Sequence, residues 1–175
     1  MSRLKMLLLF LINLSILVLA LRLLSWVPLA IEENSVRRWT SKEAVMEEMK
    51  LRKLFMPSYF PQYLRWPPSE ILAGKTPSPS VLMHFSHNET KEIVLAISQR
   101  ALEGRELKSR IEPSVIKKEE IVMLKGRQAK LLQGLCPDSR KPCSKLTWQE
   151  GQYILTVTSR DSIAETIKIA ESMLQ

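Results

Sequence analysis

A long apolar run near the N-terminus constrains this chain more than any other feature. Leu, Ile, Val, Phe and Ala dominate residues 6–29, and few polar residues interrupt them. As a helix, residues 6–26 would be about 31 Å long, enough to cross a hydrocarbon core of about 30 Å. Arg22 falls in the last turn, where its long stem lets the guanidinium reach the headgroups beside Trp26. We therefore predict a transmembrane signal-anchor segment over residues 1–31.

The same run is also compatible with a cleaved secretory signal. Arg3 and Lys5 would be its charged start, residues 6–17 its apolar core, and Val-Leu-Ala at 18–20 its cleavage site. Apolar sequence continuing to Ile31 favours a retained anchor, and both interpretations stay open. A short N-terminal tail before a large domain predicts export of residues 32–175. We expect a single-pass protein of the inner (cytoplasmic) membrane with an extracytoplasmic C-terminal domain, or a secreted protein after signal cleavage.

The remaining 144 residues are enough for one domain with a real hydrophobic core. We divide them into a connector and juxtamembrane helix over residues 32–53 and an α+β domain over residues 54–175. The net charge is +8, of which the first 39 residues supply +3 and the rest +5. This mild excess predicts no nucleic-acid partner for an exported domain. We expect partners in the envelope: the membrane, through the N-terminal helix, and an envelope protein or a lipid.

Basic residues between positions 117 and 145 are interleaved with apolar residues at strand spacing. We interpret them as the solvated face of a sheet, with contact to anionic lipid as the alternative. They are Lys117, Lys118, Lys125, Arg127, Lys130, Arg140, Lys141 and Lys145.

Two cysteines, Cys136 and Cys143, enclose a turn-forming stretch that contains two prolines. In an oxidising compartment we expect them to form a disulfide across the mouth of a hairpin. The chain-entropy estimate for so short a loop is about 2.5 kcal/mol. As zinc ligands they are two too few, and their spacing is not CxxC.

No motif predicts catalysis, a cofactor or a metal site. Gly74 begins a Gly-Lys-Thr sequence, but the earlier glycine of a phosphate-binding loop is missing. His84 and His87 are the only histidines, and at this spacing on a strand we expect them to point to opposite faces. The adjacent Glu119 and Glu120 are expected in a turn between lysines. We therefore predict a non-enzyme without catalytic residues, cofactors or metal.

Periodicity predicts helices at both ends of the domain and strands between them. A capping box from Thr40 to Glu43 opens a helix over residues 41–53, and a second one at Ser162 opens a C-terminal helix. The apolar face of that helix is predicted to comprise Ile163, Ile167, Ala170 and Leu174. The predicted strands cover residues 81–85, 93–97, 121–124, 129–132 and 146–148, with the last at 153–157.

The last two strands form the clearest hairpin. A turn at Glu150 and Gly151 is expected to set Trp148 opposite Tyr153, and Leu146 opposite Leu155. Strands followed by a covering helix predict the fold class α+β: an antiparallel sheet covered by a C-terminal helix and preceded by an N-terminal transmembrane helix.

Several short sequences carry a resemblance to a known domain type. They are Met-Pro-Ser-Tyr-Phe-Pro at 56–61, Gly-Arg-Gln-Ala at 126–129, Leu-Thr-Trp at 146–148, Gly-Gln-Tyr at 151–153 and Ile-Ala-Glu-Ser at 169–172. Residues 53–175 resemble an uncharacterised extracytoplasmic domain of small bacterial membrane-anchored proteins, which also follows the span of some anti-sigma factors. The resemblance implies fold and location, and no reaction. Because five residues precede Met6, we do not expect the cytoplasmic sigma-binding module of such factors.

Three functions remain open at this stage. The first is a non-enzymatic, membrane-tethered envelope domain for partner binding or sensing. The second is a lipid or lipoprotein carrier with an apolar cavity under the C-terminal helix, suggested by eight methionines and by a more distant likeness to half-barrel lipoprotein carriers. The third is an enzyme whose site is assembled only in three dimensions.

Overall fold

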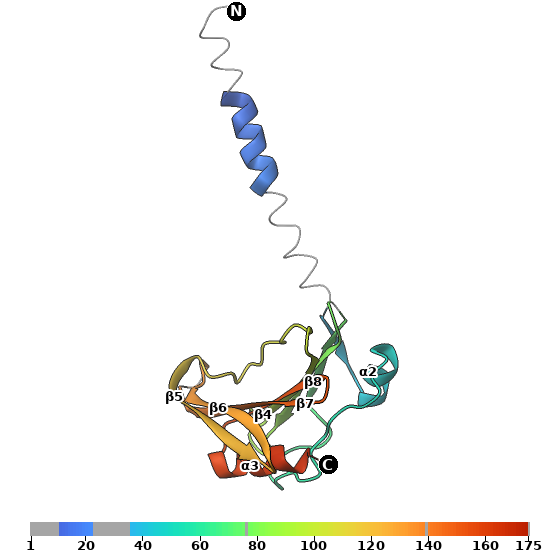
Figure 1. The fold of residues 1–175 in the computed structure, drawn as a ribbon, viewed down its shortest axis with the longest axis vertical. Coiled ribbons are helices and arrows are strands. Elements are labelled where there is room, and N and C mark those ends of the chain that lie inside the picture. Colours follow the sequence, from blue (N-terminus) through green and yellow to red (C-terminus); the bar gives the residue numbers. More distant parts are fainter. Residues whose placement is uncertain (1–10, 23–35, 76, 139, 175) are drawn as a thin grey trace, which may run out of the picture. The chain divides into compact units, whose positions relative to one another are not determined.

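The computed structural model describes residues 11–22, 36–75, 77–138 and 140–174. The chain divides into two compact units, Met1–Val36 and Arg37–Gln175. In the first unit residues 11–22 are helical, as Figure 1 shows, and most of their apolar side chains are exposed. Among the described residues, no helix is long and apolar enough to cross a membrane. The predicted anchor includes residues 1–10 and 23–31, which lie outside the described residues, as do the proposed n-region and its Arg3 and Lys5.

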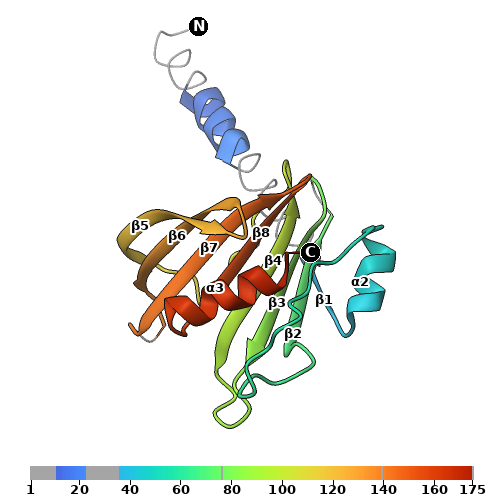
Figure 2. The same ribbon diagram turned by 60° about the horizontal axis from the view of Figure 1, so that its bottom comes forward.

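The second unit is built on one antiparallel sheet of eight strands, which Figure 2 shows from the side of its covering helix. The order is β1-β2-β3-β4-β8-β7-β6-β5. The strands are β1 (Val36–Trp39), β2 (Glu70–Gly74), β3 (Ser80–Ser86), β4 (Ile93–Ala101), β5 (Val115–Leu124), β6 (Arg127–Leu135), β7 (Pro142–Glu150) and β8 (Tyr153–Ser159). With a C-terminal helix on this sheet, the predicted α+β class is confirmed.

Two strands were not predicted, and both lie at one end of the sheet. β1 occupies part of the expected connector, and β2 precedes the Gly-Lys-Thr loop. Their sequences are Val-Arg-Arg-Trp and Glu-Ile-Leu-Ala-Gly, and neither alternates apolar and polar residues. Their strand conformation comes from pairing with the rest of the sheet, which local sequence does not reveal.

The first helix of this unit, α2 (Lys42–Glu48), is shorter than predicted and starts one residue later. Ser41, rather than Thr40, caps it, because its Oγ accepts a hydrogen bond from the Ala44 N–H at 3.2 Å. The helix stops at Met49, and Lys50 has a left-handed φ of 51°. Val45 is fully buried in the main core, so α2 belongs to the folded domain.

The C-terminal helix α3 (Ile163–Ser172) begins at the predicted cap, where Ser162 Oγ accepts from the Glu165 N–H at 3.2 Å. Most of its predicted apolar face is confirmed, since Ala170 and Leu174 are buried and Ile167 packs against the core, but the prediction is wrong for Ile163. Ile163 is 37% exposed, whereas Thr166, Ile169 and Ala170 are buried against the sheet. The buried face of α3 is rotated relative to the predicted one because the helix crosses β7 and β8 at an angle that only packing determines.

The β7–β8 hairpin forms as expected, but its register is shifted. Glu150 lies opposite Tyr153, so Trp148 lies opposite Leu155 and Leu146 opposite Val157. Gly151 and Gln152 are the turn residues, and Gly151 has a positive φ of 57°. Such a two-residue turn favours glycine at its first position, which moves the turn one residue along. The partner of each β7 residue therefore moves by two positions along β8. Because side chains alternate with a period of two, every side chain stays on its predicted face of the sheet.

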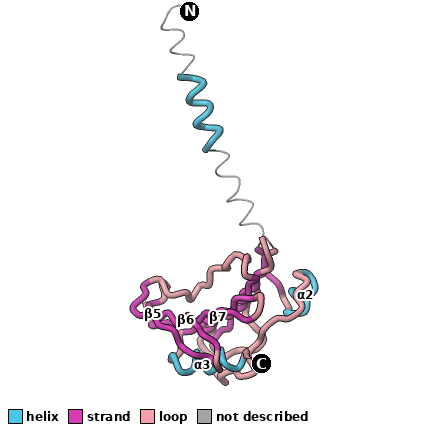
Figure 3. Tube along the Cα trace, viewed as in Figure 1, coloured by secondary structure: helices cyan, strands magenta, loops and turns pink. Residues whose placement is uncertain are grey.

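The sheet buries both of its faces. One face carries Val81, Met83, Phe85, Leu95 and Ile97 and is covered by α3, by α2 and by irregular residues 49–64. This confirms the predicted common face of Val81, Met83 and Phe85. The opposite face carries Leu82 and Ala96 and is covered by residues 102–114 with Ile111 at their centre. Those thirteen residues, all described, contain neither helix nor strand and appear as a loop in Figure 3.

The strand β5 forms an exposed edge of the sheet and carries two of the eight predicted basic residues, Lys117 and Lys118. Glu119 and Glu120 lie in β5 and not in a turn, and they pair with Lys130 at 2.7 Å and Lys118 at 2.6 Å. Ile121 and Met123 are well exposed on the same strand. Charged side chains and a bulge at Lys117 are features that discourage an edge strand from pairing with another chain.

Candidate functional site

A basic hollow lies where β1 and β2 meet the β3–β4 turn. Its volume is about 480 Å³. Three basic side chains, Arg38, Lys91 and Arg110, line it together with Glu70, the one acid among the described lining residues. The remaining lining residues are Trp39, Thr40, Ser69, Ile71 and Ile93. We refer to this site as the cationic hollow.

Glu70 connects the cationic hollow to the interior of the sheet. Its side chain is 11% exposed and contacts Arg38 Nε at 2.9 Å and Arg110 Nη2 at 3.3 Å. On its inner side, Oε2 lies 3.0 Å from His84 Nδ1. One carboxylate therefore positions two guanidinium groups, and both extend toward solvent, with Arg38 73% and Arg110 56% exposed.

His84 is a fully buried histidine in the middle of the sheet. Burial lowers its pKa below the ordinary value of 6.5 because it disfavours the charged ring, although the neighbouring Glu70 acts in the opposite direction. A neutral ring can donate from Nδ1 to Glu70 and accept at Nε2 from Ser109 Oγ, 3.2 Å away. Ser109 Oγ in turn accepts from the Ile111 N–H at 3.3 Å. Both nitrogens of the imidazole therefore have a partner.

Glu70, His84 and Ser109 have the connectivity of a hydrolase triad: carboxylate to Nδ1, and Nε2 to hydroxyl. Sequence analysis identified none of these links. However, the cavity beside Ser109 has a volume of only about 10 Å³, close to the minimum for a single water. Because a substrate needs open space at the nucleophile, the geometry favours a structural role, with His84 fastening the loop to the sheet.

The contacts of Glu70 with Arg110 and of His84 with Ser109 form one clamp on the loop of residues 102–114, and a second clamp fastens its other side. Lys145 in β7, with a side chain 12% exposed, donates from Nζ to Glu106 at 2.6 Å and also to Glu112. Burial alone would lower the Lys145 pKa, but these two hydrogen bonds outweigh it and the pKa is raised. The loop is thus held at one side by the acid Glu70 and at the other side by the base Lys145, both of which lie on the sheet.

The two clamps lie in register across the sheet. Glu70 is opposite His84, His84 opposite Ala96, Ala96 opposite Thr158, and Thr158 opposite Lys145. This row crosses β2, β3, β4, β8 and β7, and a row on one face of a sheet points its side chains the same way. Arg110 and Glu112, only two residues apart, therefore contact opposite ends of the row.

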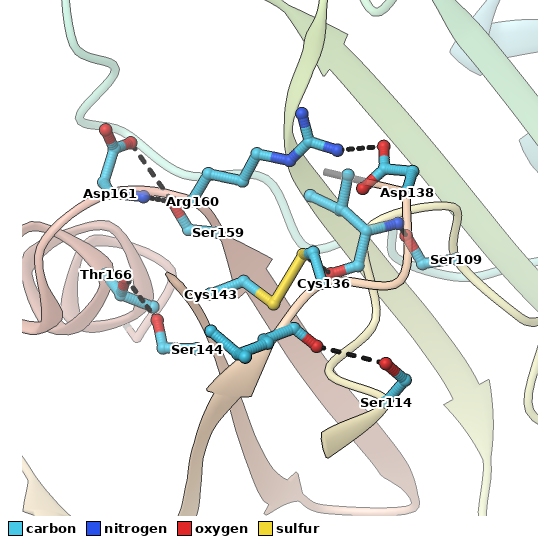
Figure 4. The surroundings of a disulfide bond; sticks show 12 residues. Ser109, Ser114, Cys136, Asp138, Cys143, Ser144, Ser159, Arg160, Asp161 and Thr166 are labelled. Atoms are coloured by element: carbon cyan, nitrogen blue, oxygen red, sulfur yellow. Dashed lines mark hydrogen bonds and ion pairs between the residues drawn. A yellow bond between two sulfur atoms is a disulfide. The ribbon is translucent and has the colours of Figure 1, made fainter. Parts of the chain in front are cut away.

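The disulfide, shown in Figure 4, lies beside the same loop. Cys136 and Cys143 are bonded with their Cα atoms 5.8 Å apart, in the mouth of the β6–β7 hairpin as predicted. Cys136 Sγ lies 3.0 Å from the carbonyl oxygen of Ile111, and both residues belong to the smaller core. Ser114 Oγ also donates to the carbonyl of Leu135 at 3.2 Å. The disulfide thus stabilises the mouth of the β6–β7 hairpin, which the end of the loop contacts.

The two histidines are not brought together. His87 stacks on Tyr63 with ring centroids 5.6 Å apart, and its Nδ1 accepts from the Glu89 N–H at 3.1 Å. Neither Tyr63 nor Glu89 is a partner of His84. Within the described ranges, no three His, Cys, Asp or Glu side chains are grouped closely enough to hold a metal ion.

Sequence analysis missed the residues of the cationic hollow because they come from separate parts of the chain. Arg38, Glu70, Lys91 and Arg110 belong to two short strands, a turn and a loop. The one available signal was a polar residue at a core position, as with His84 between Met83 and Phe85. Comparisons of the chain with protein-family models, curated proteins and solved structures found no match.

Proposed function

We propose that this chain is a non-enzymatic, membrane-tethered envelope domain that binds a partner at the cationic hollow. The observation that carries the proposal is the arrangement around Glu70, which holds two exposed guanidinium groups over a hollow of about 480 Å³. A binding site requires side chains held in place before the ligand arrives, since ordering them on binding costs free energy.

Two features support the extracytoplasmic location. The apolar run of residues 6–29 is typical of a signal-anchor segment. The paired cysteines fit an oxidising compartment. The resemblance to the extracytoplasmic domain of small membrane-anchored proteins points the same way, and α+β architecture is compatible with it.

Fractionation and protease protection test the location. Full-length protein should sediment with membranes, and protease added to spheroplasts should degrade residues 37–175. Recovery of the intact chain in the cytosol would refute the proposal. Binding is tested by photo-crosslinking from a probe placed at Thr40, on the rim of the hollow, with the same probe at exposed Lys125 as control. Equal crosslinking patterns from both positions would show that the hollow is not the binding site.

A lipid or lipoprotein carrier is the second candidate, favoured by a hollow of about 430 Å³ beside the first turn of α3. Leu135, Pro142 and Ile163 contribute apolar surface to it, and Asp161 lies at its margin. Further along the helix, Ile169 and Ala170 are fully buried against the sheet, so this space is at the start of the helix and not beneath its middle. Mass spectrometry of lipids co-purified with the protein, repeated with Ile163→Glu, tests this candidate.

An enzyme is the third candidate, and its site would be Ser109 with His84 and Glu70. A fluorophosphonate probe should label Ser109 if the hydroxyl is activated and accessible. Labelling that disappears in Ser109→Ala would replace our proposal by a hydrolase function.

A further inference from the structure

We infer that the ligand of the cationic hollow is the phosphate-bearing headgroup of an anionic lipid. This inference rests on the proposed function and names the ligand class of the same site. Three observations carry it: the charge of the lining residues, the composition of the walls, and the position of the hollow along the chain.

The charge of the lining favours an anion. Arg38, Lys91 and Arg110 are opposed by Glu70 alone among the described lining residues, which leaves a net charge of +2. Glu70 is already in contact with both arginines and with His84. A guanidinium has five N–H donors, so pairing with one carboxylate leaves donors for a second anion. Its planar fork matches the oxygens of a phosphate.

The third cation is held at the rim of the hollow. Lys91 lies in the β3–β4 turn with a positive φ of 61°, and its Nζ donates to the Asn88 carbonyl at 2.8 Å. That bond uses one of three ammonium donors. Lys91 takes no part in the Glu70 network, so its charge can be removed without disturbing the two arginines.

The walls suit a lipid better than a fully hydrated ion. Ile71 and Ile93 supply apolar surface, and Trp39 places an indole ring in the lining. The Trp39 Nε1–H is buried and has no hydrogen-bond partner within the described part of the chain. Tryptophan combines an apolar body with one polar N–H, which is why it is enriched at membrane interfaces.

The position in the chain favours a lipid over free phosphate. Eleven residues separate Trp26, at the end of the proposed span, from Arg38 in the hollow. Even fully extended, such a segment covers only about 40 Å. If residues 6–26 are inserted, the hollow is therefore always within reach of the headgroups, and the tether raises their effective concentration. A cationic site in this position attracts anionic lipid.

The experiment uses the full chain in a neutral detergent. Dihexanoyl-phosphatidylglycerol, dihexanoyl-phosphatidylcholine and inorganic phosphate are titrated separately, with binding followed by calorimetry. We expect saturable binding of the phosphatidylglycerol, binding at least tenfold weaker for the phosphatidylcholine, and none for phosphate alone over the same range. Phosphate binding as tightly as the anionic lipid would overturn the lipid assignment.

Matched variants locate the site. Arg38→Gln with Arg110→Gln should weaken binding of phosphatidylglycerol at least tenfold. Lys118→Gln with Lys130→Gln removes two charges from the distant β5–β6 edge. This control should change the affinity for phosphatidylglycerol less than twofold. If the arginine variant does not fold, Lys91→Gln tests the same point and should weaken binding about threefold. Unchanged binding in the hollow variants would overturn the inference.

The outcomes also separate this inference from the proposed function. Correct membrane location with crosslinking of the hollow to a protein, but no lipid binding, would refute the lipid and keep the binding domain. Cytosolic full-length protein would refute both.

Discussion

His84 Nε2 in β3 and Ser109 Oγ in the covering loop lie 3.2 Å apart, and this contact joins a fully buried side chain to a segment without regular structure. A loop of this length in a compact domain is commonly functional or disordered. Here it is ordered by a row of polar side chains that crosses the sheet. The chain therefore replaces the helix that often covers a sheet face with an irregular segment held by hydrogen bonds, ion pairs and a nearby disulfide.

Replacing His84 with Leu should destabilise the domain by about 2–3 kcal/mol. The reason is that Glu70 and Ser109 each lose a buried partner, and an unpaired buried polar group is costly. Urea unfolding measures the loss. Ser109→Ala, which removes one of these bonds, should cost about 1 kcal/mol. A His84→Leu variant as stable as wild type would show that the network contributes nothing.

Stability should fall as the pH decreases below the ordinary histidine pKa of 6.5. Because the folded-state pKa of His84 is lowered, the unfolded chain binds more protons there, and stability is fully present only above that value. The slope from this one group is at most about 1.4 kcal/mol per pH unit. Denaturant unfolding at pH 7.5 and 5.5 measures it. His84→Gln cannot titrate and should show a smaller loss, and an identical loss would assign the effect to other groups.

Lys145→Met should release one side of the loop. It leaves Glu106 and Glu112 without their shared cation, and the expected loss is about 1–2 kcal/mol with faster proteolysis near Arg105. Lys130→Met is the control, since its exposed pair with Glu119 should be worth less than about 0.5 kcal/mol. Limited proteolysis and urea unfolding report the two effects. Similar behaviour of both variants would mean that burial of Lys145 does not matter.

Gly134→Ala should disrupt the edge of the sheet. A Cβ at this position would lie 2.1 Å from the carbonyl oxygen of Val115, which belongs to the backbone and has no rotamer to move. We expect a loss above about 2 kcal/mol and faster amide exchange along β5. Gly126→Ala has open space and only a φ of +86° to oppose it, so it should cost about 1 kcal/mol. Retention of wild-type exchange in β5 would contradict this packing.

Replacing Cys136 and Cys143 with Ser should lower stability by about 2 kcal/mol and leave the fold intact, because the closed loop is short. Native protein should give a peptide two hydrogens lighter under non-reducing mass spectrometry. Alkylation of both thiols in protein taken fresh from cells would contradict the exported location.

Local sequence determined the elements that carry their own signals. Ser162 with Glu165 marked the start of α3, and short apolar runs bounded by polar residues marked β3 and β4. Cys136 and Cys143 indicated the β6–β7 hairpin because the residues between them form turns. These signals are local: a cap, a short apolar run and a turn depend on residues within a few positions of each other. Together they were enough for the α+β class.

Tertiary structure decided which face of α3 is buried, how β7 and β8 are aligned, and where the polar residues meet. Ile163 looked like a core residue and is exposed, since the crossing angle of α3 follows from packing. Glu70, His84 and the adjacent pair Ser109 and Arg110 come from three separate segments, and the register of β2 and β3 sets Glu70 opposite His84. Local sequence therefore determined six of the eight strands and the cap of α3, whereas long-range pairing between strands assembled the cationic hollow.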